Sequence, residues 1–509
     1  MNYAIGIDIG TSGTKSALYS RDGRLIASHT AEYPLSQPQN GYAEQDPADW
    51  WEAVTASLRA ILGESGVSAQ EVAGLGLSGQ MHGLVLLDEE GEVLRPAILW
   101  CDSRTGAEAE ELTRRFTREK LIAITANPAI ASFTAAKILW VQKHEPEIWA
   151  KVRKILLPKD YIRYRLTGEF ATEVSDASGM QLLDIAGRCW SPEILEGLSL
   201  TEGMLGKVYE SAEITGRVTS EAAAQTGLAE GTLVAGGAGD NAAAAVGTGV
   251  VEDGRAFTTI GTSGVLFAHT SQMKLDPQGR VHTFCCAVPG EWHVMGVTQA
   301  AGLSMKWLRD TLCTEETAQA EQEGIDSYAL LDRMAADVPI GAGKLLYLPY
   351  LMGERTPHLD PNARGVFFGL SAIHEKKHLI RAVLEGVSYS LRDCAGVLAE
   401  MGVTSSRMMA CGGGAKSPLW RQMLADVYHC PVQMPESNEG ASLGAAILAL
   451  VAAGEYSSVQ EACRTIVKPS QECCPDESRS AAYDAVYEVY RGLYPPLAES
   501  YRKLAGLEE

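Results

Sequence analysis

The first 80 residues alternate between short apolar runs and segments with helical spacing. Residues 3–9 (YAIGIDI) form an apolar run, and a second run, SALYS at 16–20, follows a Gly- and Thr-rich break. Two such runs joined by tight turns predict a β-hairpin. Apolar residues then recur at helical spacing over 49–62, and the run at 72–77 predicts another strand. This part of the chain therefore predicts an α/β unit.

Strand and helix patterns keep alternating from about residue 47 to residue 250, where a charged turn, VEDGR at 251–255, interrupts them. A new apolar strand follows and ends in IGTSG at 260–264, which repeats the sequence of residues 9–13. The repeat indicates either two related halves, each with a phosphate-binding turn, or a chance recurrence of small residues. A helical tail is predicted from about 480 to 507, with a Tyr and Leu stripe typical of core packing.

Length and charge indicate the number of domains and limit the kinds of partner. A chain of 509 residues exceeds what one hydrophobic core usually supports, so we predict two domains, 1–250 and 251–509. The 43 Lys and Arg against 64 Asp and Glu give a formal net charge of −21. That balance argues against nucleic acid or an anionic membrane surface as the main partner, although it permits a local basic pocket for a nucleotide.

Membrane and secretory signals are missing from the pattern. The N-terminus, MNYAIGIDIG, has no basic region before a long apolar run, so it does not resemble a signal peptide. The stretch 440–454 is too short and too rich in small residues for a membrane span and predicts a buried helix. The eleven cysteines are odd in number and show no C-x-x-C spacing, which indicates reduced thiols in a cytoplasmic protein.

Two Gly-rich segments are candidates for phosphate binding. In residues 8–15 (DIGTSGTK), Asp8 stands at a strand end before a turn of glycines and hydroxyls, which can bring N–H and O–H donors to phosphate oxygens. Asp8 could also hold the water shell of Mg²⁺. Residues 411–418 (CGGGAKSP) precede a helical pattern and could contact an anion or a flat ring. A tight hairpin and a glycine-rich helix start are the structural alternatives.

Asp240 is the candidate catalytic base. It ends the glycine run AGGAG at 235–239 and is followed by Asn241 and an alanine-rich helix pattern. Glycines allow a carboxylate to be brought close to a substrate, but an Asp at a helix start is also a good N-cap. Taken alone, the segment favours capping.

In this order, these elements resemble the FGGY carbohydrate kinases of the actin-like ATPase superfamily. Residues 132–140 (SFTAAKILW) are similar to the first signature of that family, and GVFFGL at 365–370 with HL at 378–379 and AVLE at 382–385 to the second. The resemblance covers essentially the whole chain. It implies an α/β fold of two ribonuclease-H-like domains that face a catalytic cleft and close over ATP, Mg²⁺ and a small sugar.

The resemblance also implies roles for individual residues. Within the family, residues 79–83 (GQMHG) and 100–104 (WCDSR) are most similar to xylulokinases, and glycerol kinases carry an Arg-Glu pair where this chain has Met81 and His82. D-xylulose is therefore the expected substrate. The implied catalytic and metal residues are Asp240, as general base, and Asp8. The implied sugar ligands are Met81, His82, Arg104, Asp240 and Asn241. The implied nucleotide ligands are Thr11, Ser12, Thr14, Lys15, Gly261, Thr262, Gly302, Gly413, Gly414 and Ser417.

Three alternatives stay open at this point. A sister kinase could act on ribulose, gluconate, glycerol or another polyol, because one or two pocket residues can redirect specificity. An actin-like ATPase that serves as a scaffold or chaperone would share the phosphate loops, but it would not need residues 79–83 and 132–140. A catalytically dead sugar sensor is disfavoured by the presence of Asp8, Asp240 and all three Gly-rich loops.

Arg104 with Asp102 could simply form an ion pair. The resemblance also allows a homodimer.

Overall fold

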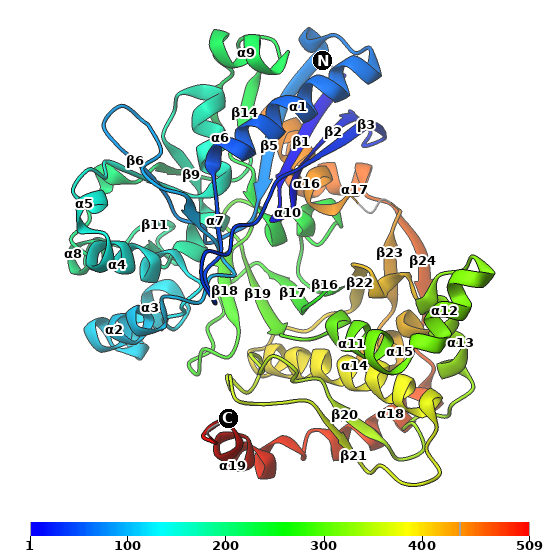
Figure 1. Ribbon diagram of the computed structural model, residues 1–509. Helices are drawn as coiled ribbons and strands as arrows, with labels where there is room; N and C mark the ends of the chain where they lie inside the picture. Colours follow the sequence, from blue (N-terminus) through cyan, green and yellow to red (C-terminus); the bar gives the residue numbers. More distant parts are fainter. Residues whose placement is uncertain (1, 437–438, 508–509) are drawn as a thin grey trace.

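The structure is a computed structural model and describes residues 2–436 and 439–507. Two seven-stranded sheets form the centres of two lobes, with the N-terminal sheet at the top of Figure 1 and the C-terminal sheet below it. The predicted two-domain α/β architecture is therefore confirmed.

The N-terminal sheet begins with the predicted hairpin. Its strands are β1 (Tyr3–Ile9), β2 (Gly13–Ser20), β3 (Leu25–Glu32), β5 (Val72–Gly79), β13 (Ile214–Arg217), β14 (Leu233–Ala235) and β15 (Ala238–Gly239). Their order is β13-β14-β5-β1-β2-β3, with β15 paired to the end of β5. β1, β2 and β3 pair antiparallel, whereas β5 runs parallel to β1, and β14 runs parallel to β5.

The C-terminal sheet repeats this plan. Its strands are β16 (Arg255–Ile260), β17 (Gly264–Thr270), β18 (His282–Cys285), β19 (Trp292–Thr298), β22 (Arg407–Cys411), β23 (Val432–Pro435) and β24 (Pro469–Cys473). β16 pairs antiparallel with β17, and β17 with β19, while β22 runs parallel to β16 and β23 runs parallel to β22. Five strands of each sheet, β3-β2-β1-β5-β14 and β19-β17-β16-β22-β23, thus share one order and one pattern of directions. Both IGTSG segments form the turn of the first hairpin, which supports two related halves over chance recurrence.

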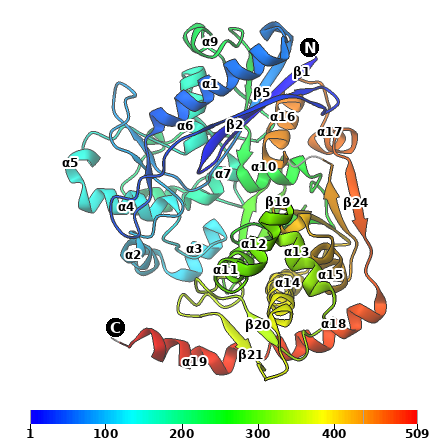
Figure 2. The same ribbon diagram turned by 45° about the vertical axis from the view of Figure 1, so that its right-hand side comes forward.

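Helices from distant parts of the chain cover the N-terminal sheet. α1 (Pro47–Ser65) packs on β2 and β3, whereas α16 (Gly440–Ala452) packs on β1 and β5 together with α10 (Asp240–Gly247). Figures 1 and 2 both show α16, from the C-terminal half of the sequence, beside the N-terminal sheet. The second half of the chain therefore crosses back to the first lobe, which the division at residue 250 did not include.

Glycines and alanines allow this close packing of α16. A Cβ on Gly6 of β1 would stand 1.8 Å from the Ser442 carbonyl oxygen, and one on Gly444 would stand 1.9 Å from the Ala243 carbonyl oxygen. Backbone meets backbone at both places, so no side chain fits between the elements. The small-residue composition of 440–454 therefore serves a buried helix, as predicted.

A mostly helical region is inserted into the first lobe. Its helices are α2 (Gly106–Phe116), α3 (Arg118–Thr125), α4 (Thr134–His144), α5 (Pro146–Trp149), α6 (Pro158–Thr167), α7 (Val174–Ala177) and α8 (Pro192–Gly197). This region docks on β18 and β19 of the second lobe. The Ser178 hydroxyl accepts a hydrogen bond from the Cys285 amide at 3.1 Å, and the Trp292 indole donates to the Ile185 carbonyl at 3.1 Å.

Helices also surround the C-terminal sheet: α11 (Gly302–Leu312), α12 (Thr314–Glu323), α13 (Ser327–Ala336), α14 (Lys376–Glu400), α15 (Pro418–Tyr428), α18 (Glu477–Tyr490) and α19 (Tyr494–Ala505). The predicted tail is thus two helices. Tyr483, Tyr487, Tyr490 and Tyr501 of this tail are buried in the core of the second lobe, as the stripe predicted. Across residues 2–436 and 439–507, no helix is long and apolar enough to cross a membrane.

Candidate active site

Asp8 and Asp240 lie at neighbouring strand ends. β5 is flanked by β1 on one side and by β15 on the other, with Asp8 opposite Ser78 and Gly239 opposite Gly79. Asp240 follows Gly239 directly as the first residue of α10. Parallel neighbours in a sheet are about 4.8 Å apart, so the two carboxylates emerge at the same edge across a single intervening strand. Two acids that are 232 positions apart in the sequence thus share one site.

Electrostatics agree with this proximity. The pKa of Asp240 is raised to about 6, first because burial disfavours the charged form and then because Asp8 is close by. Burial also raises the pKa of Asp8, against a hydrogen bond from the Ser78 hydroxyl at 2.9 Å and the charge of Lys15. Raised carboxylate pKa values in a cleft are typical of a functional site.

The backbone around Asp240 is held by buried side chains. The Gly239 amide donates to the Ser175 hydroxyl at 3.1 Å, and that hydroxyl donates to Glu173 at 3.0 Å. Gly239 is the N-cap of α10, and Asp240 is the first residue of the helix. Its Oδ1 accepts from the backbone amide and the side-chain amide of Asn241, at 2.7 and 2.9 Å. The capping alternative for Asp240 therefore does not describe its role.

The first Gly-rich turn directly follows β1, the strand that carries Asp8. Lys15 donates to Glu439 at 2.6 Å, which connects β2 to the residue before α16. The Thr11 hydroxyl accepts from the Trp100 indole at 3.0 Å, and Ser12 is exposed. Thr14 differs from the other proposed nucleotide ligands, because its side chain is buried and lies 3.4 Å from the Tyr33 hydroxyl. Its hydroxyl therefore faces the core of the lobe.

His82 is held in an uncommon backbone conformation. Its φ is +67°, and its carbonyl accepts from the Lys137 ammonium at 2.7 Å and from the Thr134 hydroxyl at 3.2 Å. The Nδ1 atom lies 2.8 Å from the Gly179 carbonyl, to which it can only donate, and the ring stacks on Phe133 with centroids 4.5 Å apart. Burial lowers the pKa of His82 to about 3, so the ring is neutral and Nε2 is an acceptor.

The other proposed sugar ligands differ in their surroundings. Met81 is buried against the backbone of Gly239, where a Cβ would stand 3.0 Å from the Met81 side chain. Arg104 instead pairs with Asp102 at 2.7 Å and with Glu44 at 2.8 Å. Its guanidinium also stacks over Tyr42, 3.6 Å from the ring centroid. This arrangement favours the ion-pair alternative for Arg104 over sugar contact.

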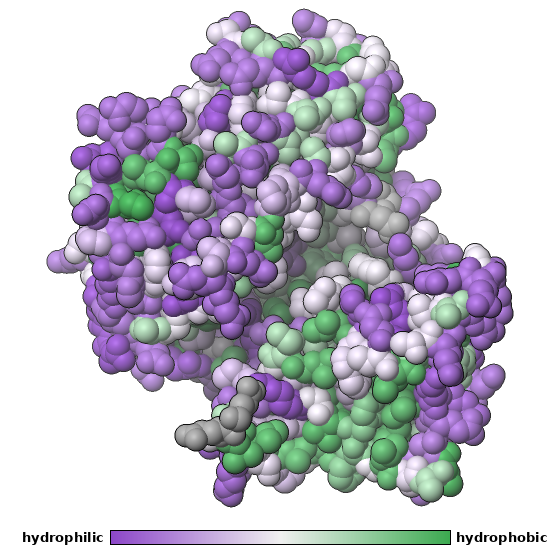
Figure 3. All heavy atoms as spheres, in the orientation of Figure 1, coloured by the Kyte–Doolittle hydropathy of each residue, from purple (hydrophilic) through white to green (hydrophobic). Residues whose placement is uncertain are grey.

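The second lobe supplies a nucleotide-sized pocket. A cavity of about 460 Å³ is lined by Gly261, Thr262, Gly302, Gly413, Gly414 and Ser417, all of which were proposed as nucleotide ligands. Ligand pockets commonly measure about 300–1,000 Å³. Gly302 has to be a glycine, because a Cβ there would stand 2.4 Å from the Gly261 carbonyl oxygen. Ser417 caps α15 by accepting from the Trp420 amide at 3.0 Å. The space-filling view shows a recess between the two lobes (Figure 3).

The sequence analysis did not predict a role for several residues that lie at the site. Lys137 lies within the SFTAAKILW motif but had no assigned role, and its partner carbonyls belong to Ser132 and His82. Glu439, Ser78 and Ser175 stand in segments without any motif. The nucleotide pocket further includes Lys306, Tyr328, Asp332 and Trp420, from three helices whose sequences look ordinary. Only Lys137 carried a signal, since a lysine among apolar helix positions must find partners when it is buried.

Two duplicated ribonuclease-H-like units, with paired acids in one lobe and a glycine-lined nucleotide pocket in the other, define a phosphotransferase of the actin-like ATPase class. Family models agree with this assignment: the N-terminal domain of the FGGY family of carbohydrate kinases matches residues 3–247, and its C-terminal domain matches residues 256–453. The chain therefore belongs to the FGGY family of carbohydrate kinases. This result excludes the scaffold or chaperone alternative.

Individual relatives cover nearly the whole chain. A xylulose kinase of Escherichia coli (strain K12) is 42% identical, over 97% of this chain and 99% of the relative. A gluconokinase of Bacillus subtilis (strain 168) is 32% identical over 99% and 98%. The crystal structure of a xylulose kinase from Rhodospirillum rubrum is 32% identical and superimposes with a TM-score of 0.91, covering 98% of this chain and all of the other.

Proposed function

We propose that this kinase transfers the γ-phosphoryl group of ATP to D-xylulose, giving D-xylulose 5-phosphate, with Asp240 as the general base. The observation that carries the proposal is that Asp240 lies close to Asp8 and directly follows Gly239, against which Met81 packs. The similarity to xylulose kinases, at up to 42% identity, supports the choice of sugar. The gluconokinase relative makes gluconate the second candidate.

In the proposed mechanism, positioning does most of the work, because the transition state of phosphoryl transfer is loose. Asp240 Oδ2 accepts the hydrogen bond of the attacking sugar hydroxyl and takes its proton as the new P–O bond forms. Met81 provides an apolar wall, and the neutral His82 accepts from a sugar hydroxyl through Nε2. The phosphates of ATP would lie between the Gly10–Gly13 and Gly261–Gly264 turns.

The carboxylates of Asp8 and Asp240 fit a Mg²⁺ ion, because each is buried and the charge of Asp8 raises the pKa of Asp240, as expected where a cation is to be added. Among the described residues, no cluster of three or more His, Cys, Asp or Glu side chains could hold a metal ion. Mg²⁺ would accordingly take its remaining ligands from water and from the ATP phosphates, as it commonly does. Bound there, the ion supplies charge neutralisation to the phosphates.

A panel assay tests the proposed function. Purified protein is incubated with ATP, Mg²⁺ and one of D-xylulose, D-ribulose, D-gluconate or glycerol, and ADP release is measured. We expect D-xylulose to give the highest kcat/KM. If another compound gives a higher kcat/KM, the choice of sugar is wrong and the kinase assignment stands. If none stimulates ADP release, the proposed reaction is wrong.

We further propose that the enzyme acts in the cytoplasm, which the eleven free cysteines support. A homodimer stays a prediction for sedimentation analysis.

A further inference from the structure

A second cavity lies where the chain passes between the lobes, away from the active site. Its volume is about 230 Å³, several times the ~30 Å³ that one water occupies in the liquid. It is lined by the connection from α10 to β16, by the starts of β16 and β22, by β23, and by α17 (Val459–Ile466) with the residues that follow it. Two of the segments that join the lobes therefore form its walls.

The cavity is separated from the second phosphate-binding turn by the length of β16. Arg255 begins β16, and the Gly261–Gly264 turn follows the other end of the same strand. At about 3.3 Å per residue, the six-residue strand separates the two places by roughly 16 Å. A ligand of this cavity would thus be distinct from the nucleotide.

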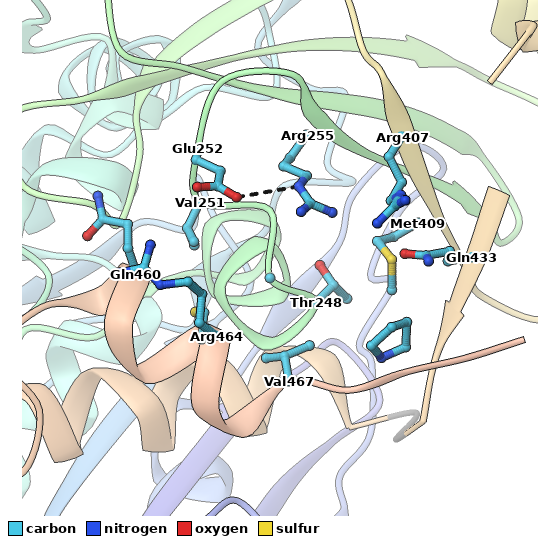
Figure 4. A pocket seen from close by; sticks show the side chains of 13 residues that line it. Thr248, Val251, Glu252, Arg255, Arg407, Met409, Gln433, Gln460, Arg464 and Val467 are labelled. Atoms are coloured by element: carbon cyan, nitrogen blue, oxygen red, sulfur yellow. Dashed lines mark ion pairs between the residues drawn. The ribbon is translucent and has the colours of Figure 1, made fainter. Parts of the chain in front are cut away.

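Two arginines face each other in this cavity. Arg255 and Arg407 are register partners on the parallel strands β16 and β22, so their side chains leave the same face of the sheet about 4.8 Å apart. Figure 4 shows both side chains pointing into the pocket toward Thr248, with Arg464 on the opposite side, on α17. Like charges directly opposite one another destabilise a sheet. Arg255 is 36% and Arg407 41% exposed, so solvent screens part of their repulsion, and an anion between the two guanidinium groups would offset the rest.

The protein neutralises these charges only weakly. Glu252 is 3.5 Å from Arg255, and Glu472 is 3.9 Å from Arg407, both longer than the 2.7–2.9 Å of a strong charge-assisted bond. Glu252 is 48% exposed and Glu472 is 38% exposed, so solvent screens both pairs. Three arginines against one carboxylate line this cavity, in a chain whose net charge is −21.

We propose that this cavity binds a phosphoryl group, with Arg255 and Arg407 as its cationic ligands and Arg464 closing the site from α17. Guanidinium groups donate paired hydrogen bonds that match the oxygens of a phosphate, which favours this ligand class over a halide or a neutral sugar. Free inorganic phosphate and a phosphorylated sugar share this chemistry. The inference does not depend on which sugar the enzyme phosphorylates.

Binding of inorganic phosphate tests the site. All calorimetric titrations are run with the ATP site saturated by a non-hydrolysable ATP analogue and Mg²⁺ and the sugar site saturated by the sugar that the panel assay identifies, so that only a further site can respond. We expect one phosphate per chain, at least tenfold weaker binding to the double variant Arg255→Gln/Arg407→Gln, and tighter binding to Glu252→Gln, which lacks the competing carboxylate. The control Arg114→Gln/Arg502→Gln removes the same charge from exposed positions and should bind as the wild type does.

Thermal unfolding provides a second readout that shows whether the variants fold. Without phosphate, the Arg255→Gln/Arg407→Gln protein should have a Tm equal to or above that of the wild type, because the repulsion is gone. Added phosphate should raise the Tm of the wild type and leave that of the double variant unchanged. Titration with D-xylulose 5-phosphate then separates the two ligand sources: tighter binding than phosphate identifies the sugar phosphate, and equal or weaker binding identifies free phosphate. The proposal is overturned if wild type and double variant bind phosphate equally, or if neither binds it.

Discussion

Replacing Asp240 by Asn tests the proposed general base most directly. Both hydrogen bonds from Asn241 end on Oδ1, and in the described parts of the chain no donor reaches Oδ2, which is therefore the oxygen available to the sugar hydroxyl. The substitution keeps the shape of the side chain and removes the proton acceptor. General-base catalysis commonly contributes about 10²–10⁴-fold, or roughly 2.7–5.4 kcal/mol at about 1.36 kcal/mol per tenfold, so kcat should fall by that factor.

The assay measures kcat with coupled ADP detection and the affinities of sugar and ATP by calorimetry. Both affinities should stay within about threefold of the wild type, since Asn still forms hydrogen bonds. The raised pKa adds a further signature: only the ionised carboxylate accepts a proton, so wild-type kcat/KM should fall as the pH drops below about 6, and the variant should lack this limb. Asp393→Asn is the control, because that carboxylate is equally buried, has a pKa raised to about 7 and bonds Tyr487 in the second lobe. A kcat within tenfold of the wild type would refute the role of Asp240.

Three further substitutions probe the surroundings of the site. Ser175→Ala leaves the Gly239 amide without its acceptor, so kcat should fall about tenfold with ATP affinity unchanged, whereas the control Ser178→Ala, which also removes a buried hydroxyl acceptor, should lower only Tm. Lys137→Met removes the donor to the His82 carbonyl, so the KM for sugar should rise about tenfold and that for ATP should not. Burial lowers the pKa of Lys137 to about 7, against about 10.4 in the unfolded chain. Between these two pH values the unfolded chain binds one more proton than the folded protein. As the pH rises from about 7 to about 10.4, the unfolding free energy of the wild type should therefore increase, relative to that of Lys137→Met, by up to about 1.4 kcal/mol per pH unit. Gly444→Ala forces a Cβ to 1.9 Å from the Ala243 carbonyl and should cost at least about 1–3 kcal/mol, while Gly63→Ala, with nothing within 4 Å, should raise Tm slightly.

Much of the fold was readable because local patterns agree with it. The apolar run 3–9, the break at 10–14 and the run 16–20 are a hairpin in the structure, and the helical spacing at 49–62 lies inside α1. The small-residue stretch 440–454 is a buried helix. Its location could not be read, because composition shows that a helix packs closely but does not show on which sheet. The return of α16 to the first lobe depends on tertiary contacts, which the local sequence pattern does not reveal.

The site residues also divide into those that the sequence could predict and those that it could not. Gly261, Gly302 and Gly413 could be proposed because the resemblance places glycines at defined points of a motif, and all three line the nucleotide cavity. Arg104 shows the opposite case: the resemblance implied a sugar contact, but Asp102, Glu44 and Tyr42 surround it. Whether a charged side chain faces a ligand or a neighbour depends on residues that are distant in the sequence, so a motif cannot decide it.

Lys15 and Glu439 indicate why the second half of the chain has to return. Glu439 directly precedes α16, and α16 packs on β1, the strand that carries Asp8. The ion pair between Lys15 and Glu439 therefore fixes the first phosphate-binding turn to a helix that comes from the other half of the sequence. Both halves share one strand order, so each could bind phosphate through its own hairpin turn. In the first half, β5 joins β1 to β15 while the returning helix packs on β1 and on α10, so the sheet and α16 together hold Asp8 and Asp240 at one edge. The crossing of α16 thus adds a second support to the edge of the sheet at which we propose that phosphoryl transfer occurs.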